Sequence, residues 1–87
     1  MKRPIQVSIQ DFPTNVAVVF IDPKTQSKIG PVRRYSTNEM VFELLRRAHA
    51  NLETINLVEL AFAERRPIMI DLHLTEEQIA ALSRRGR

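Results

Sequence analysis

The chain has 87 residues, the length of one small domain, and it contains no cysteine, which excludes disulfide bonds and thiolate sites. Hydrophobic residues make up 44% and charged residues 26%, values that are typical of a globular domain and exclude a disordered chain. The longest apolar run, residues 16–21, is too short to span a membrane, and the basic start lacks the apolar stretch of a secretory signal. We expect a single compact, soluble domain over residues 1–87, located in the cytoplasm.

Positive charge is concentrated in the first part of the chain. The net charge is +3, but residues 1–35 carry six basic and two acidic side chains, and no acidic residue lies between Asp22 and Glu39. This stretch holds the candidate basic patch, which consists of Lys24, Lys28, Arg33 and Arg34. Arginine suits phosphate and carboxylate groups, so the patch predicts contact with nucleic acid or with an acidic protein. A solvated face is the simpler interpretation.

Two strands are expected at the start of the chain. Ile5, Val7 and Ile9 alternate with polar residues, as in a strand with one buried face. Residues 16–21 are continuously apolar and mostly β-branched, which predicts a central strand covered on both faces. Residues 28–35 contain Gly30 and Pro31, so they predict only an edge strand or an irregular return.

Three helix starts are indicated by capping boxes, each flanked by a pair of apolar residues in the staple positions. The boxes begin at Ser36, Asn56 and Thr75 and end at an acidic residue or glutamine. Each would satisfy backbone N–H groups that otherwise lack a partner in the first turn. Asn51 is expected in a left-handed conformation after the first helix. The second helix is expected to stop before Pro67, because proline disfavours helical conformation in the residue that precedes it. The predicted helices end near Ala50, Arg66 and Arg85.

The last predicted strand gives the fold class. Residues 68–74 alternate apolar and other side chains, so the expected order is β-β-(β)-α-α-β-α. This order predicts an α+β domain with a small antiparallel or mixed sheet of three to four strands and three helices on one face. We expect the strand over residues 68–74 to pair with the strand over residues 16–21, because these two are the most apolar.

The second predicted helix is apolar on nearly all sides, which is unusual in so small a domain. Either this helix lies centrally in the domain, or its outer face meets another subunit. The second possibility predicts a homodimer or a complex with a protein partner. The candidate self-association residues are Leu57, Leu60, Ala61 and Phe62.

Groups suited to catalysis are few. Asp71 and His73 lie two residues apart and therefore share one face of a strand, which could orient an imidazole or supply two metal ligands. A metal site needs further ligands, and the only other histidine is His49. The simpler interpretation is that Asp71 and His73 form the solvent side of the strand. Gly30 and Gly86 are the only glycines, which excludes a glycine-rich phosphate loop.

These observations favour a non-enzymatic interaction or self-association module. We expect no catalytic or metal-binding residues, no cofactor, no small-molecule ligand and no membrane contact. The alternative is a nucleic-acid-binding accessory protein that uses the basic N-terminal part of the chain. A small enzyme is a third, less favoured hypothesis.

Overall fold

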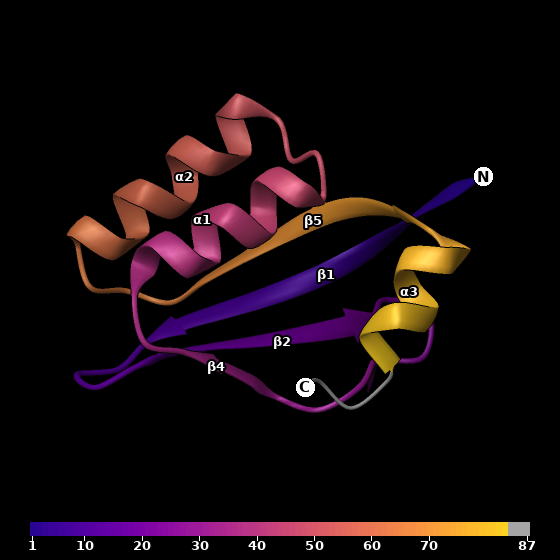
Figure 1. The fold of residues 1–87 in the computed structure, drawn as a ribbon, viewed down its shortest axis with the longest axis horizontal. Helices are drawn as coiled ribbons and strands as arrows, with labels where there is room; N and C mark the ends of the chain where they lie inside the picture. Colours follow the sequence, from indigo (N-terminus) through magenta and orange to yellow (C-terminus); the bar gives the residue numbers. More distant parts are fainter. Residues whose placement is uncertain (84–87) are drawn as a thin grey trace.

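The computed structural model describes residues 1–83, which form an α+β fold with one antiparallel sheet and helices on one of its faces (Figure 1). The element order, β-β-β-β-α-α-β-α, agrees with the predicted fold class. The elements are β1 (Lys2–Asp11), β2 (Val16–Asp22), β3 (Ser27–Lys28), β4 (Arg33–Tyr35), α1 (Asn38–Arg47), α2 (Leu52–Ala63), β5 (Ile68–Thr75) and α3 (Glu76–Ser83).

The sheet has five strands over the described residues, in the order β3-β2-β1-β5, with β4 also paired to β2. The prediction that the last strand would lie beside residues 16–21 is wrong, because β1 lies between them and pairs with both. The β1–β2 hairpin already occupies one side of β1, so β5 returns from the helices to the other side. Apolar content correctly indicated that β2 is an interior strand, between β1 and the short strands β3 and β4, but it wrongly indicated the same of β5, which lies at the edge.

Helices cover β2 on one face only. Val18 and Phe20 point toward the helices and are buried, whereas on the opposite face Val19 and Ile21 are partly buried and the small side chain of Ala17 is buried. The continuous apolar run thus belongs to a strand with one helix-covered face, and not to a strand covered on both. We call the opposite side of the sheet the helix-free face.

The segment after β2 forms two short strands where the sequence predicts one weak strand. β3 and β4 are separated by Gly30, whose φ of 75° lies in the left-handed region. Ile29 donates a backbone hydrogen bond to the Phe20 carbonyl (2.8 Å), which keeps this return attached to β2. The interruption at Gly30 and Pro31 is therefore confirmed, and it raises the strand number to five.

Two of the three predicted helix starts need correction. α1 begins one residue later than predicted, because Thr37 is the N-cap and its Oγ1 accepts from Met40 N. α2 begins five residues earlier than predicted, with Asn51 as N-cap and its Oδ1 accepting from Thr54 N (2.8 Å). Asn56 therefore lies inside α2, and His49 rather than Asn51 has the left-handed φ, at 59°.

The third helix start is confirmed. Gln78 N donates to Thr75 Oγ1 (3.1 Å), and Thr75 N donates to Gln78 Oε1 (2.8 Å), which is the reciprocal pair of a capping box. α2 ends at Ala63, shortly before Pro67, close to its predicted end. The predicted end of the third helix near Arg85 lies outside the described residues.

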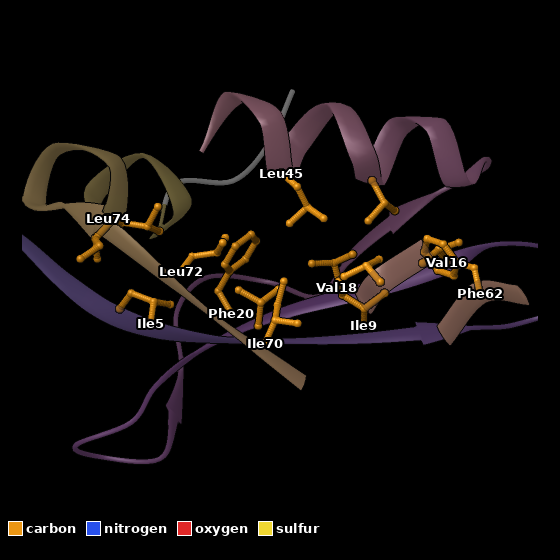
Figure 2. Packing of buried hydrophobic residues seen from close by; sticks show 14 residues of the cluster. Ile5, Ile9, Val16, Val18, Phe20, Leu45, Phe62, Ile70, Leu72 and Leu74 are labelled. Carbon is orange, nitrogen blue, oxygen red and sulfur yellow. The ribbon is translucent and has the colours of Figure 1, made fainter. Parts of the chain in front are cut away.

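The core fills the space between the sheet and the helices (Figure 2). In register across β1 and its neighbours, Val7 lies opposite both Phe20 and Ile70. From the helical layer, Val41 and Leu45 of α1 and Val58 of α2 are fully buried against this surface. One continuous apolar cluster therefore holds α1 and α2 on the sheet.

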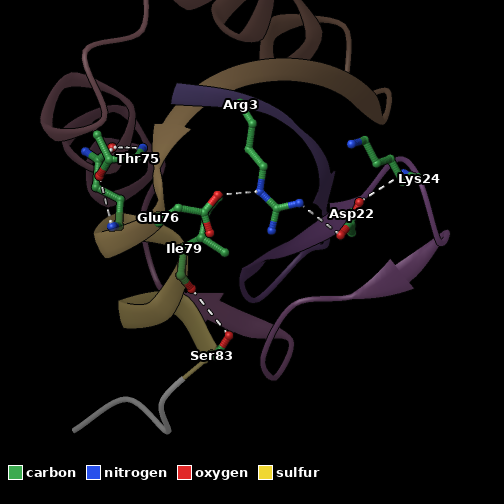
Figure 3. Close-up of polar contacts among 8 residues, drawn as sticks. Arg3, Asp22, Lys24, Thr75, Glu76, Ile79 and Ser83 are labelled. Atoms are coloured by element: carbon green, nitrogen blue, oxygen red, sulfur yellow. Dashed lines mark hydrogen bonds and ion pairs between the residues drawn. The ribbon is translucent and has the colours of Figure 1, made fainter. Parts of the chain in front are cut away.

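A polar cluster and one close backbone approach hold α3 at the end of the sheet (Figure 3). Arg3 on β1 forms ion pairs with Asp22 (Nη1–Oδ2 3.4 Å) and with Glu76 at the start of α3 (Nε–Oε2 3.1 Å). Near the other end of α3, the Leu82 carbonyl lies directly against Gly30. α3 is thus attached to the sheet at both of its ends.

Candidate self-association surface

The structure divides the four candidate self-association residues into two pairs. Ala61 and Phe62 are buried within the chain, and the Phe62 ring meets Phe42 of α1 edge to face, with centroids 5.5 Å apart. Leu57 and Leu60 are each 48% exposed. The unusual apolar character of α2 therefore has two causes, a buried side in the core and three exposed leucines, which are Leu57, Leu60 and, at the start of the helix, Leu52.

Helix geometry gives the direction in which these leucines point. Successive residues turn by about 100°, so Leu60, two residues before Phe62, lies on nearly the opposite side of α2 from the contact with α1. Leu57 lies three residues before Leu60 and shares its side. α2 packs on α1 and on β5, and Figure 1 shows it displaced from α1 in the direction of β5. The side of α2 opposite α1, to which helix geometry assigns both leucines, is therefore the side nearer the β5 border of the sheet.

β5 forms that border of the sheet. Over residues 1–83 it pairs with β1 and with no other strand. The Phe20 carbonyl accepts a hydrogen bond from Ile29 N, so the backbone groups of Phe20 point toward β3. Phe20 and Val7 are therefore a non-hydrogen-bonded pair, and the N–H and C=O groups of Val7 point away from β2 and toward β5. Val7 lies opposite Ile70, and the backbone direction alternates along the strand.

The alternation identifies the backbone groups at the free edge. Ile70 and Leu72 bond to β1, whereas Met69, Asp71 and His73 direct their N–H and C=O groups outward. Among the described residues, no hydrogen bond from another segment reaches these three backbones. All three side chains are exposed on the helix-free face. β5 therefore presents an eight-residue edge strand that can accept another strand.

A small polar recess of about 120 Å³ lies at the middle of this edge. Asp71 and His73 line it from β5, and the turn between α1 and α2 lines it with His49. Lys2 and Thr54 complete its wall. Both histidines of the chain thus line the same recess as Asp71, but over residues 1–83 no group of three His, Cys, Asp or Glu side chains could hold a metal ion.

The structure does not gather the candidate basic patch on one surface. Arg33 lies opposite Val18 and points to the helix side, where its Nη2 donates to the Leu82 carbonyl (3.0 Å). Arg34 lies opposite Ala17 and points to the helix-free face, where its Nη1 donates to Asn15 Oδ1 (3.2 Å). Two consecutive residues of a strand point in opposite directions, which the sequence pattern did not take into account.

The two lysines of the patch are exposed. Lys28 lies opposite Ile21 and therefore shares the helix-free face with Arg34. Lys24 is in the turn after β2, where its backbone N–H donates to Asp22 Oδ1 (2.9 Å). The helix-free face thus carries part of the basic patch without Arg33.

Sequence reasoning missed the free edge and Met69. The alternation of residues 68–74 correctly placed Asp71 and His73 on one face. It could not show that β5 has only β1 as a neighbour within residues 1–83, because that depends on which strands pair. The strand order in the structure is what identifies this strand as an edge strand.

Within residues 1–83, no helix is both long and apolar enough to cross a membrane. No protein-family model matches the chain, and no curated protein or solved structure matches it.

Proposed function

We propose that this protein is a non-enzymatic self-association module in which two copies join through the α2–β5 surface. We define the α2–β5 surface as Leu57, Leu60 and the free edge of β5 at Met69, Asp71 and His73. The proposal is carried by two half-exposed leucines on α2, the helix that packs against β5, together with the edge of β5 that has no partner strand over residues 1–83. A two-fold dimer would use this one patch on both copies.

Approximate free energies indicate that dimerisation needs both the exposed leucines and the free edge of β5. Full burial of a leucine contributes about 1.5–3 kcal/mol, so covering a half-exposed one contributes about 1 kcal/mol. Four leucines in a dimer then contribute about 4 kcal/mol, which is no more than the low end of the roughly 4–15 kcal/mol lost in translational and rotational freedom. Backbone hydrogen bonds between two edges, at about 0.5–1.5 kcal/mol each, supply the remainder.

The chemistry of the exposed groups supports binding rather than catalysis. The chain has no cysteine and two histidines, and both histidines line a shallow polar recess at the strand edge. The larger cavities, of about 180 and 290 Å³, are lined mainly by apolar side chains around Leu44 of α1. Within residues 1–83, no hydrogen bond joins a nucleophilic side chain of these cavities to a base, as covalent catalysis requires.

The alternative is a nucleic-acid-binding accessory protein. Its support is that Lys28 and Arg34 share the helix-free face. It has less support than self-association, because the guanidinium of Arg33 is used within the chain.

Sedimentation velocity of glutamate variants tests the proposal. Leu57→Glu and Leu60→Glu each place a charge in the proposed interface and are expected to give monomers where the wild-type chain gives dimers. Met40→Glu is the matched control, because Met40 is 46% exposed and lies on the side of α1 away from Phe42 and α2. Circular dichroism establishes that each variant is folded. A wild-type monomer at high concentration, or equal dimerisation of all variants, contradicts the proposal.

A further inference from the structure

We propose that the two copies pair β5 with β5 in an antiparallel register that sets Asp71 of each copy opposite His73 of the other. This inference rests on the proposed function and specifies how the edges meet. The result is one continuous sheet across the dimer, with the two-fold axis beside Leu72.

Backbone direction limits the possible registers. Hydrogen-bonded pairs across the new interface can form only between residues that direct their backbone groups outward, which are Met69, Asp71 and His73. In an antiparallel pair of identical strands related by a two-fold axis, the residue numbers of two opposing residues have the same sum at every position, and this sum defines the register. Asp71 can therefore lie opposite Asp71, opposite Met69 or opposite His73.

Side-chain chemistry separates these three registers. Asp71 opposite Asp71 brings two carboxylates together, which is destabilising. Asp71 opposite Met69 pairs each carboxylate with a neutral side chain and sets His73 opposite Pro67, which has no N–H to donate. Asp71 opposite His73 pairs an acidic with a basic side chain twice in the dimer. It also sets Met69 opposite Thr75, whose N–H already donates to Gln78 Oε1. Both of these registers allow four backbone hydrogen bonds between the central pairs, so the opposite charges favour Asp71 opposite His73.

The neighbouring charges are compatible with this register. Lys2 and His49 line the same recess as Asp71 and His73, so Asp71 lies among basic groups. None of the ion pairs within residues 1–83 involves Asp71. Its carboxylate is therefore available to an imidazole from a second copy. On the helix side, the same register places Leu72 opposite Leu72, which extends the apolar face of the sheet.

Charge reversal tests the register in the full chain, through the dimer dissociation constant measured at mildly acidic pH. Asp71→Lys and His73→Glu each replace two attractive pairs by repulsive ones, and each is expected to weaken dimerisation by roughly tenfold to a hundredfold. The double variant Asp71→Lys/His73→Glu restores opposite charges and is expected to recover most of the affinity. Glu59→Lys is the control, because it makes the same charge change on an exposed position of α2.

The outcomes separate the register from the proposed function. Recovery in the double variant supports the register, because the Asp71–Asp71 register would bring two lysines together instead. A double variant as weak as the single ones, with a dimeric wild type, overturns the register and leaves self-association intact. A monomeric wild type overturns both.

Disulfide formation gives an independent readout in this cysteine-free chain. Residues opposite each other in a hydrogen-bonded pair have Cα atoms about 5.5 Å apart, within the range that a disulfide can bridge. Asp71→Cys mixed with His73→Cys is therefore expected to form a crosslinked heterodimer on oxidation, faster than either variant with itself. Faster crosslinking of Asp71→Cys with itself overturns the register.

Discussion

The guanidinium of Arg33 donates a hydrogen bond to the backbone carbonyl of Leu82 (Nη2–O 3.0 Å), which joins β4 to the last turn of α3. Carbonyls in the last turn of a helix have no partner within the helix, so a side-chain donor from another segment stabilises that end. Arg33 therefore holds α3 on the sheet. The adjacent arginines of the candidate basic patch, Arg33 and Arg34, thus include one residue with a structural role.

Loss of this bond is expected to lower stability. We expect Arg33→Met, which keeps the apolar part of the side chain, to reduce the free energy of unfolding by about 1–3 kcal/mol, because a charged donor is removed from a partly buried carbonyl. Arg34→Met is the control, and its effect is expected to stay within about 0.5 kcal/mol, since Arg34 is exposed. Urea unfolding measures both, and equal effects of the two changes contradict the assigned role.

Gly30 is expected to tolerate no side chain. Its φ is 75°, and a Cβ atom there would overlap the carbonyl oxygen of Leu82. The left-handed conformation alone costs an L-residue about 1–2 kcal/mol, and the overlap forces α3 to move as well. We therefore expect Gly30→Ala to lower the free energy of unfolding by more than about 2 kcal/mol and to shift the amide resonances of α3. A loss below about 1 kcal/mol with unchanged α3 resonances rules out this packing.

The start of α2 shows where local sequence signals are ambiguous. Asn51 and Asn56 can both begin a capping motif, and the sequence pattern favoured Asn56 because of Glu59. Packing decides in favour of Asn51, since the longer helix also brings Ile55 against the core. Local patterns therefore predicted that the helix exists and approximately where it ends, but not which of two competent caps is used.

The two asparagines are expected to respond differently to alanine. Asn51→Ala removes the acceptor for Thr54 N and is expected to reduce the free energy of unfolding by about 0.5–2 kcal/mol. Asn56→Ala replaces an exposed helix-interior residue by the best helix former and is expected to be neutral or slightly stabilising. Thermal unfolding of both variants measures this. A larger loss of stability for Asn56→Ala than for Asn51→Ala contradicts Asn51 as the N-cap and supports the helix start predicted from the sequence.

The candidate site was only partly predictable for a related reason. The apolar surface of α2 was visible in the sequence, but its division into a buried and an exposed side depends on where α1 lies. Phe62 packs against Phe42 and is buried, whereas Leu57 is half-exposed. The alternation in residues 68–74 placed Asp71 and His73 on one face, and the free edge emerged only from the pairing of β5 with β1.

The molar mass of the wild-type chain in solution, measured by light scattering over increasing concentration, tests self-association most directly. One chain has a mass of 10.1 kDa. We expect the measured mass to rise with concentration and level off at twice this value, as a closed two-fold dimer requires. A mass that stays at that of one chain at every concentration contradicts self-association through the α2–β5 surface.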